Sequence, residues 1–157
     1  ISGGELELNS IDAAVRCVAD VNISGGSINI SSAADGIQAG KNINGFPSET
    51  GTATISGGSL FISSAKRAID AKDSLSITGG TGFALSGAKK ALEAEADGQP
   101  YVSYKFSGSA GNDVQFGELA TVTAKYDFTS ILFSSPELAS GAEYTVTCGQ
   151  RSETVTA

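Results

Sequence analysis

Apolar and polar residues alternate along short segments of residues 1–98, which is the pattern of half-buried β-strands. The alternation recurs in four units that share Ile-Ser-Gly-Gly or Ile-Thr-Gly-Gly and begin at residues 1, 23, 55 and 77. The starts are 22, 32 and 22 residues apart, and removing an inserted loop at 45–54 restores a period of 22. Each unit therefore predicts three short strands joined by Gly, Ser, Asn and Asp corners.

Equivalent apolar positions form columns across the four units. The columns are Leu6, Ile28, Leu60 and Phe83; Leu8, Ile30, Ile62 and Leu85; and Val15, Ile37, Ile69 and Leu92. The fourth unit fits this alignment if one residue is inserted near Gly82. Because stacking such units places like residues ~4.8 Å apart, we expect an all-β fold, a right-handed parallel β-helix of about four turns over 1–98. Strict alternation and the short period exclude helical repeats and propeller blades.

Residues 99–157 have a different composition, with eight of the eleven aromatic residues of the chain. Alternation predicts strands at 101–106, 119–126, 131–133 and 144–148, and Ser-Ser-Pro at 134–136 and Ala-Ser-Gly at 139–141 predict turns. No disordered linker separates this range from the repeats. We therefore expect 99–157 to form a small antiparallel β unit that packs on the last turn and caps it.

Composition excludes several classes of function. The net charge is −7, which argues against nucleic acid as a partner, because phosphate recognition needs a basic face. The chain has no His, so the Ser-His-Asp triad and the usual zinc sites are excluded. No apolar run approaches the ~20 residues of a membrane span. Because the chain opens on Ile inside a repeat and contains no Met, we expect further turns or domains upstream.

Two stretches carry a resemblance to a known family. The repeated Ile-Ser-Gly-Gly with Asp-Gly-Ile-Gln-Ala at 35–39, and an ending with Phe-Ser-Ser-Pro-Glu-Leu from 133 and Gly-Ala-Glu-Tyr-Thr-Val from 141, resemble the secreted bacterial carbohydrate-binding β-helix family. Its coil is similar to that of pectate lyases. The resemblance implies a secreted or cell-surface bacterial protein that binds plant cell-wall polysaccharide, including acidic pectin-type glycans, with calcium in Asp-rich corners.

Basic residues occupy two corners where that family tends to carry adjacent acids. They are Lys66, Arg67, Lys89 and Lys90. If the units stack in register, these cations lie in neighbouring turns, and something must compensate for their repulsion. One interpretation is purely structural, with Asp70 and Glu93 as counter-charges. The other is recognition of a glycan carboxylate, for which Arg offers a bidentate fork and Lys a point charge.

Two further features are candidates for ligand contacts. Phe61 alternates to the outside of its strand, where it either stacks on a sugar ring or is covered by the C-terminal unit or the inserted loop. Asp12 and Asp35 fall at equivalent corners and are a weak calcium site or ordinary solvated carboxylates. No other cofactor is expected.

The hypothesis that accounts for most of these features is non-catalytic binding of an extracellular, plant cell-wall-type and acidic polysaccharide. One alternative is a polysaccharide lyase, which needs a base such as Arg67 and calcium beside it. Another is an adhesin or surface spacer that binds no glycan. Both alternatives remain open at the level of the sequence.

Overall fold

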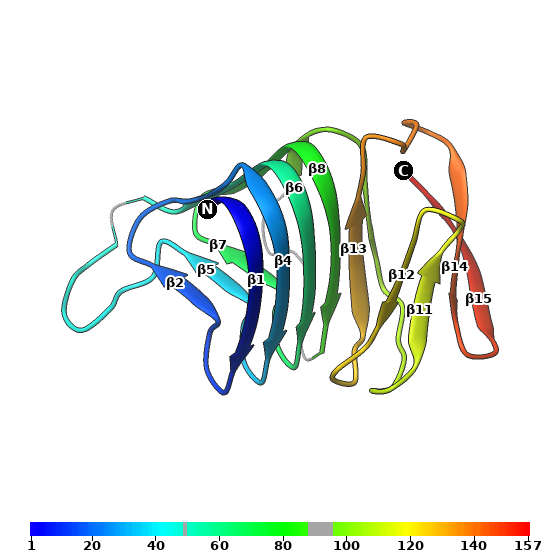
Figure 1. Ribbon diagram of the computed structural model, residues 1–157, viewed down its shortest axis with the longest axis horizontal. Coiled ribbons are helices and arrows are strands. Elements are labelled where there is room, and N and C mark those ends of the chain that lie inside the picture. Colours follow the sequence, from blue (N-terminus) through cyan, green and yellow to red (C-terminus); the bar gives the residue numbers. More distant parts are fainter. Residues whose placement is uncertain (49, 88–95) are drawn as a thin grey trace.

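The computed structural model describes residues 1–48, 50–87 and 96–157, and the strands fall into three sheets (Figure 1). The main sheet has the order β1-β4-β6-β8-β13-β10, with β3 also paired to β6 and β9 to β8. Its strands are β1 (Ser2–Ser10), β3 (Val21–Ile23), β4 (Gly25–Ser32), β6 (Thr52–Ser64), β8 (Ser74–Ser86), β9 (Ala96–Gly98), β10 (Tyr101–Tyr104) and β13 (Ser130–Ser134).

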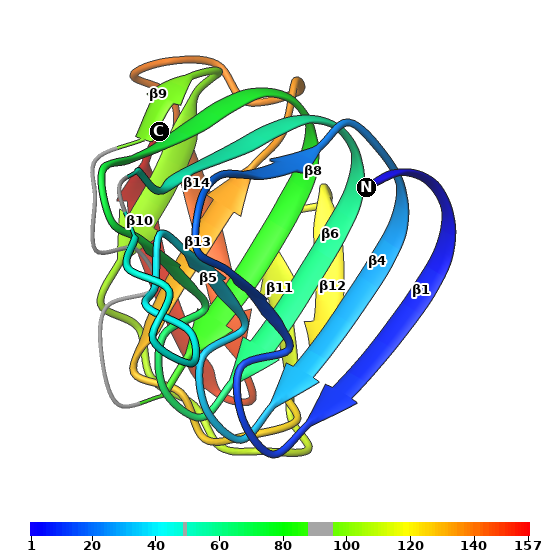
Figure 2. The ribbon, with the colours of Figure 1, turned by 90° about the vertical axis from the view of Figure 1, so that its left-hand side faces the viewer.

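The other two sheets flank the main one. A short parallel sheet contains β2 (Val15–Cys17), β5 (Ile37–Ala39) and β7 (Ile69–Ala71). Figure 2 looks from the β1 side and shows β5 across the interior from β1, β4, β6 and β8. The third sheet is antiparallel, in the order β12-β11-β14-β15, and consists of β11 (Asp113–Phe116), β12 (Ala120–Thr123), β14 (Glu143–Cys148) and β15 (Arg151–Thr156).

Equivalent positions of the first three units are direct partners. Ile28 pairs with Leu60, and Ile37 pairs with Ile69, so the expectation that these two isoleucines are stacked neighbours is confirmed. Leu92 lies outside the described residues. The paired apolar side chains of the long and short sheets fill a first core between them. Each strand thereby satisfies the backbone groups of its neighbour while it buries one face.

The expected right-handed parallel β-helix of about four turns, with an antiparallel unit packed on its last turn, is nevertheless wrong. The main sheet is mixed: β1, β4, β6 and β8 are parallel, but β13 pairs antiparallel with β8, and β10 antiparallel with β13. The fold is therefore all-β with a mixed main sheet and a distinct antiparallel sheet. The repeat period identified neighbouring strands, but it held no information on how the free edge of β8 is paired. The division into 1–98 and 99–157 stays a prediction, and strands from both ranges lie in the main sheet.

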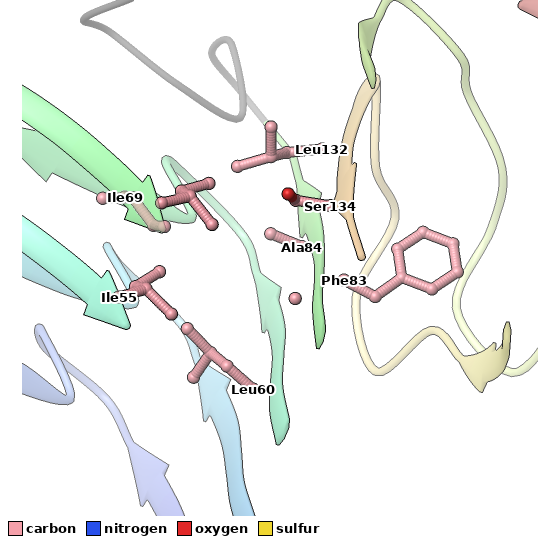
Figure 3. Close-up of a pocket in the computed structure, with 9 residues that line it drawn as sticks. Ile55, Leu60, Ile69, Phe83, Ala84, Leu132 and Ser134 are labelled. Atoms are coloured by element: carbon pink, nitrogen blue, oxygen red, sulfur yellow. The ribbon is translucent and has the colours of Figure 1, made fainter. Parts of the chain in front are cut away.

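The register of β8 also corrects the alignment of the fourth unit. Phe83 pairs with Phe61, and Gly82 pairs with Leu60, so the inserted residue does not lie near Gly82. Because a shift of one residue exchanges the two faces of a strand, Phe83 and Leu85 point away from the first core. They belong to a second core, between the main sheet and the antiparallel sheet. Figure 3 shows the ring of Phe83 directed away from Leu60.

The shared Gly-Gly pair has a structural origin. A Cβ at Gly57 would stand 2.6 Å from the carbonyl oxygen of Ser24, and a Cβ at Gly58 would stand 2.5 Å from that of Gly26. Gly58 also has a φ of 84°, a conformation that L side chains rarely adopt. The motif therefore permits close stacking of neighbouring long strands at an irregularity in their register, and it need not contact a ligand.

Candidate functional site

Charged and polar side chains gather on the outer side of the short sheet. Arg16, Gln38 and Asp70 are successive partners across β2, β5 and β7. Their neighbours in these strands, such as Val15 and Ile37, point the opposite way into the first core. The alternation of a strand thus gives the short sheet one apolar face and one hydrogen-bonding face.

A buried ion-pair network forms the base of this face. Arg67 donates from its backbone N–H and its Nε to Asp35 Oδ1, at 2.9 Å and 3.2 Å, and its second guanidinium nitrogen lies 2.8 Å from Asp70 Oδ2. The side chains of Asp35 and Asp70 are only 6% and 4% exposed. Burial by itself raises the pKa of Asp35, but the hydrogen bonds from Arg67 and Gln38 outweigh it, so that this pKa lies below its usual value.

Three cations lie above this base, nearer to solvent. Arg16 donates to Gln38 Oε1 at 2.6 Å and to Asp12 Oδ1 at 3.0 Å. The ammonium of Lys41 lies 2.8 Å from Asp70 Oδ2. Lys72 Nζ donates to the backbone carbonyl of Ser48 at 2.8 Å, and these contacts fix where the positive charges stand.

These cations line an open cleft of about 520 Å³, hereafter the cationic cleft. Its lining residues are Arg16, Gln38, Gly40, Lys41, Asn42 and Lys72. The side chains of Arg16 and Lys41 are 36% and 33% exposed, whereas that of Asp70 is nearly buried. Lys41 and Lys72 are nearer to solvent than the nearly buried Asp70, whereas Asp12, the partner of Arg16, is itself exposed. The two lysines therefore give the cleft positive charge in a protein of net charge −7.

The predicted basic corners are only partly described. Lys66 is exposed, and Arg67 is bound to Asp35 and Asp70, while Lys89 and Lys90 lie outside the described residues. The ligand-binding role of these four residues stays a prediction. For Arg67, the contacts agree with the structural interpretation, in which Asp70 compensates its charge.

Sequence reasoning missed Lys41 and Lys72 because they do not occupy identical places in their units. The two lysines follow the paired residues Ala39 and Ala71 at the ends of β5 and β7, but by two positions and by one. A search for basic residues within two positions of that shared Ala would have found both. Arg16 follows Val15 of a repeat column, and alternation by itself predicts that its side chain points outward.

Phe61 lies where its alternation predicted, on the outer side of β6. It pairs with Asn29 of β4 and Phe83 of β8, and it is half-buried against the second core. The C-terminal unit therefore covers part of this ring, and the rest of it lines a groove. The covering that the sequence analysis offered as an alternative to sugar stacking is thus only partial.

Comparison with family models adds an independent finding. Residues 1–132 match the model described as carbohydrate-binding domain-containing protein. The chain belongs to this family. The match supports the part of the predicted resemblance that concerns carbohydrate binding. It does not support the finer part, which concerned a family with a pectate-lyase-like coil. No curated protein and no solved structure matches the chain significantly.

The residues around Asp12 and Asp35 do not fit the calcium ion that the resemblance implied. Calcium takes six to eight oxygen ligands, several of them from carboxylates. Here Asp35 already accepts hydrogen bonds from Arg67 and Gln38, and Asp12 is paired with Arg16. Two guanidinium groups at the site would repel a cation. Within 1–48, 50–87 and 96–157, no group of three or more metal-ligating acid or Cys side chains comes together.

Both cysteines are free. Cys148 is buried, as expected for a small apolar residue, and Cys17 is half-buried beside the first core. Burial raises the pKa of the Cys148 thiol, which keeps it protonated and unreactive at neutral pH. A search of the described part of the chain finds no helix of the length and apolarity that a membrane crossing requires.

Proposed function

We propose that this protein is a non-catalytic module that binds acidic, plant cell-wall-type polysaccharide in the cationic cleft. Membership of a carbohydrate-binding family supports the glycan, and the single observation that supports the acidic class is the set of cations from Arg16, Lys41 and Lys72. A sugar carboxylate can take a bidentate hydrogen bond from a guanidinium and a further one from an ammonium.

The arrangement of charge favours a polymer over a small anion. The net charge of −7 repels a polyanion at long range, so that attraction is confined to the cleft. An open cleft leaves room for a polymer that continues beyond it, and many weak contacts along one chain add up to useful avidity. Because such polysaccharides lie outside the cell, we also propose that the protein is secreted or displayed on a bacterial cell surface.

The geometry does not favour the lyase alternative. A lyase needs a base that can give up its proton and a calcium ion that acidifies the substrate. The guanidinium of Arg67 is held by two buried carboxylates, and the nearby acids are paired with arginines. Non-catalytic binding requires neither group.

The test is affinity electrophoresis in gels that contain polygalacturonate. Replacement of both Lys41 and Lys72 by Gln removes two charged donors, and we expect affinity to fall about tenfold or more. Lys105→Gln removes an exposed lysine outside the cleft and should leave retardation unchanged. Circular dichroism would check that each variant is folded.

Three results would contradict the proposal. Unchanged affinity of the double variant would show that the cleft is not the site. No retardation of the unmodified protein would favour the spacer alternative. An increase in ultraviolet absorbance from an unsaturated sugar product would favour the lyase.

A further inference from the structure

A second hollow lies on the opposite side of the main sheet from the cationic cleft. Its floor is the outer face of β4 and β6, and its wall is β12, the edge strand of the antiparallel sheet. This groove, hereafter the Phe61 groove, has a volume of about 340 Å³. Its lining residues are Ser27, Ile28, Asn29, Ser59, Phe61, Thr121, Val122, Thr123 and Lys125.

The groove exists because the antiparallel sheet covers only part of the main sheet. Paired residues form one file across the outer face, namely Glu7, Asn29, Phe61, Phe83 and Phe133. Phe83 and Phe133 are buried in the second core, whereas Asn29 and Phe61 are half-buried. Phe61 therefore stands at the boundary where cover by the antiparallel sheet ends.

The wall of the groove is fastened to its floor. The backbone N–H of Lys125 donates to Ser63 Oγ at 2.9 Å, which joins the segment after β12 to β6. Thr123 Oγ1 donates to Asp113 Oδ1 at 2.7 Å, which holds this hydroxyl on the face of β12 opposite to Val122 and the second core. A site assembled on paired strands in this way is formed before a ligand arrives, which lowers the entropy cost of binding.

The lining combines one aromatic ring with side chains that form hydrogen bonds and carry no negative charge. Hydroxyls come from Ser27 and Ser59 and an amide from Asn29, while Thr121 and Thr123 border the groove and Lys125 supplies a cation. The face of an aromatic ring is weakly negative and attracts the weakly positive C–H bonds on the flat side of a sugar ring. Hydroxyl and amide groups match the sugar hydroxyls at its rim.

We propose that the Phe61 groove is a second glycan site, which binds an uncharged sugar ring stacked on Phe61. The file of Asn29 and Phe61 runs across strands at ~4.8 Å spacing, close to the length of one sugar ring. A neutral chain lying across β4 and β6 would thus place successive rings over successive members of the file. The inference does not depend on the cationic cleft, because the two sites differ in face, lining and ligand charge.

The test compares side chains of similar bulk at position 61. Phe61→Leu keeps an apolar group against the second core but removes the π face, and circular dichroism checks that the variant is folded. In gels that contain dextran, galactomannan or hydroxyethylcellulose, we expect retardation by at least one polymer. Phe61→Leu should weaken that affinity about three- to tenfold, whereas Phe61→Tyr should retain it.

A spectroscopic variant provides a second measurement. The chain contains no Trp, so that Phe61→Trp introduces the only indole of the protein. Its emission should shift when the retarding neutral polymer is added, and Phe46→Trp, at a side chain of the inserted loop that is 68% exposed, serves as the matched control. Retention by Phe61→Leu equal to that of the unmodified protein, an unchanged emission of Phe61→Trp, or no retardation by any of the three polymers would overturn the inference.

The two glycan proposals can fail separately. Loss of Lys41 and Lys72 should weaken retardation by polygalacturonate and leave the neutral polymers unaffected. Phe61→Leu should show the reverse. If the Lys41 and Lys72 double variant and Phe61→Leu both changed the affinity for one and the same polymer, and for no other, the assignment of a distinct neutral ligand to the Phe61 groove would be wrong.

Discussion

The two hydrophobic cores are built from different residues, although both contact the main sheet. The first core, between the main and short sheets, consists of buried Ile, Leu, Val and Ala, with Tyr101 at its margin. The second core, between the main and antiparallel sheets, contains five buried phenylalanines: Phe83, Phe106, Phe116, Phe128 and Phe133. Strand β8 contributes to both, since Ala84 faces the first core and Phe83 the second.

The difference follows from how strands meet in each place. In the parallel part, equivalent residues stack on one another at ~4.8 Å, so that the same compact shape must fit above and below itself. Between two facing sheets, aromatic rings can meet at an angle. Phe116 of β11 stacks on Phe133 of β13 at 4.3 Å between ring centroids, and it lies edge-on to Phe83 of β8 at 6.3 Å. The rings of the second core therefore come from two facing sheets, whereas the first core is made of aliphatic side chains of stacked strands.

Removal of the central aromatic ring should have the largest effect. Phe133 contacts both Phe83 and Phe116 and is fully buried, so we expect Phe133→Ala to lower the free energy of unfolding by about 3–5 kcal/mol. Urea denaturation measures the change. Phe46→Ala, at an exposed ring, should stay within ~0.5 kcal/mol. A loss below ~1 kcal/mol for Phe133→Ala would mean that the aromatic core does not hold the antiparallel sheet in place.

The polar network of the parallel part should give a smaller effect that depends on pH. Because the folded-state pKa of Asp35 is lowered, its charge stabilises the fold above the unfolded value of 3.8, and this contribution is lost as pH falls through the folded pKa. We expect Asp35→Asn to lower stability at pH 7 by about 1–3 kcal/mol. The difference from the unmodified protein should shrink as pH falls below 3.8.

The control for that experiment is a carboxylate in a similar corner. Asp12 pairs with Arg16, but its side chain is 66% exposed. Asp12→Asn should change stability by less than ~1 kcal/mol at any pH tested, as is typical of surface pairs. Equal effects of the two substitutions in a pH series of urea melts would show that burial of Asp35 is not what makes it stabilising.

The smallest effect should occur at the boundary of the two cores, and it should be favourable. Gly82 lines a void of about 10 Å³ with Leu60, Leu132 and other apolar side chains (Figure 3). A Cβ at Gly82 would meet nothing within 4 Å, and its φ is outside the left-handed region. We expect Gly82→Ala to raise the free energy of unfolding by about 0.4–1 kcal/mol, chiefly through the entropy of the unfolded chain.

Substitution of a second glycine distinguishes the effect of room for a methyl group from the effect of backbone conformation. Gly45 is equally open, but its φ is 84°. Gly45→Ala should therefore destabilise the protein by about 1 kcal/mol. Thermal denaturation of both variants makes the comparison, and a destabilised Gly82→Ala would show that the void below β8 is not open to a methyl group.

Prediction from the sequence succeeded where local pattern and repeat period were sufficient. The period identified Ile37 and Ile69 as partners, and alternation located β10, β12, β13 and β14 within the predicted ranges or close to them. It missed β11 and β15. It also placed Phe83 in the wrong core, because Phe83 and Leu85 alternate equally well on either face of a strand and only the pairing partner distinguishes the faces.

The candidate sites were predictable to a lesser degree. The outward direction of Phe61 followed from alternation, but the groove beside it required β12, which comes sixty residues later in the chain. A cationic surface was expected at Lys66, Arg67, Lys89 and Lys90. The cations that line the cationic cleft are instead Arg16, Lys41 and Lys72, brought together by turns that differ in length between units. The buried partners of Arg67 could be proposed from the sequence only for Asp70.

What the sequence by itself determined is which strands of the first three units are neighbours, because alternation and period are local properties of the chain. Only the tertiary structure decided the antiparallel pairing of β13 with β8, the aromatic second core, and how much of the main sheet the antiparallel sheet covers. Those depend on contacts between residues far apart in the chain, which side-chain alternation leaves unspecified. The Phe61 groove and the cationic cleft both arise at that level.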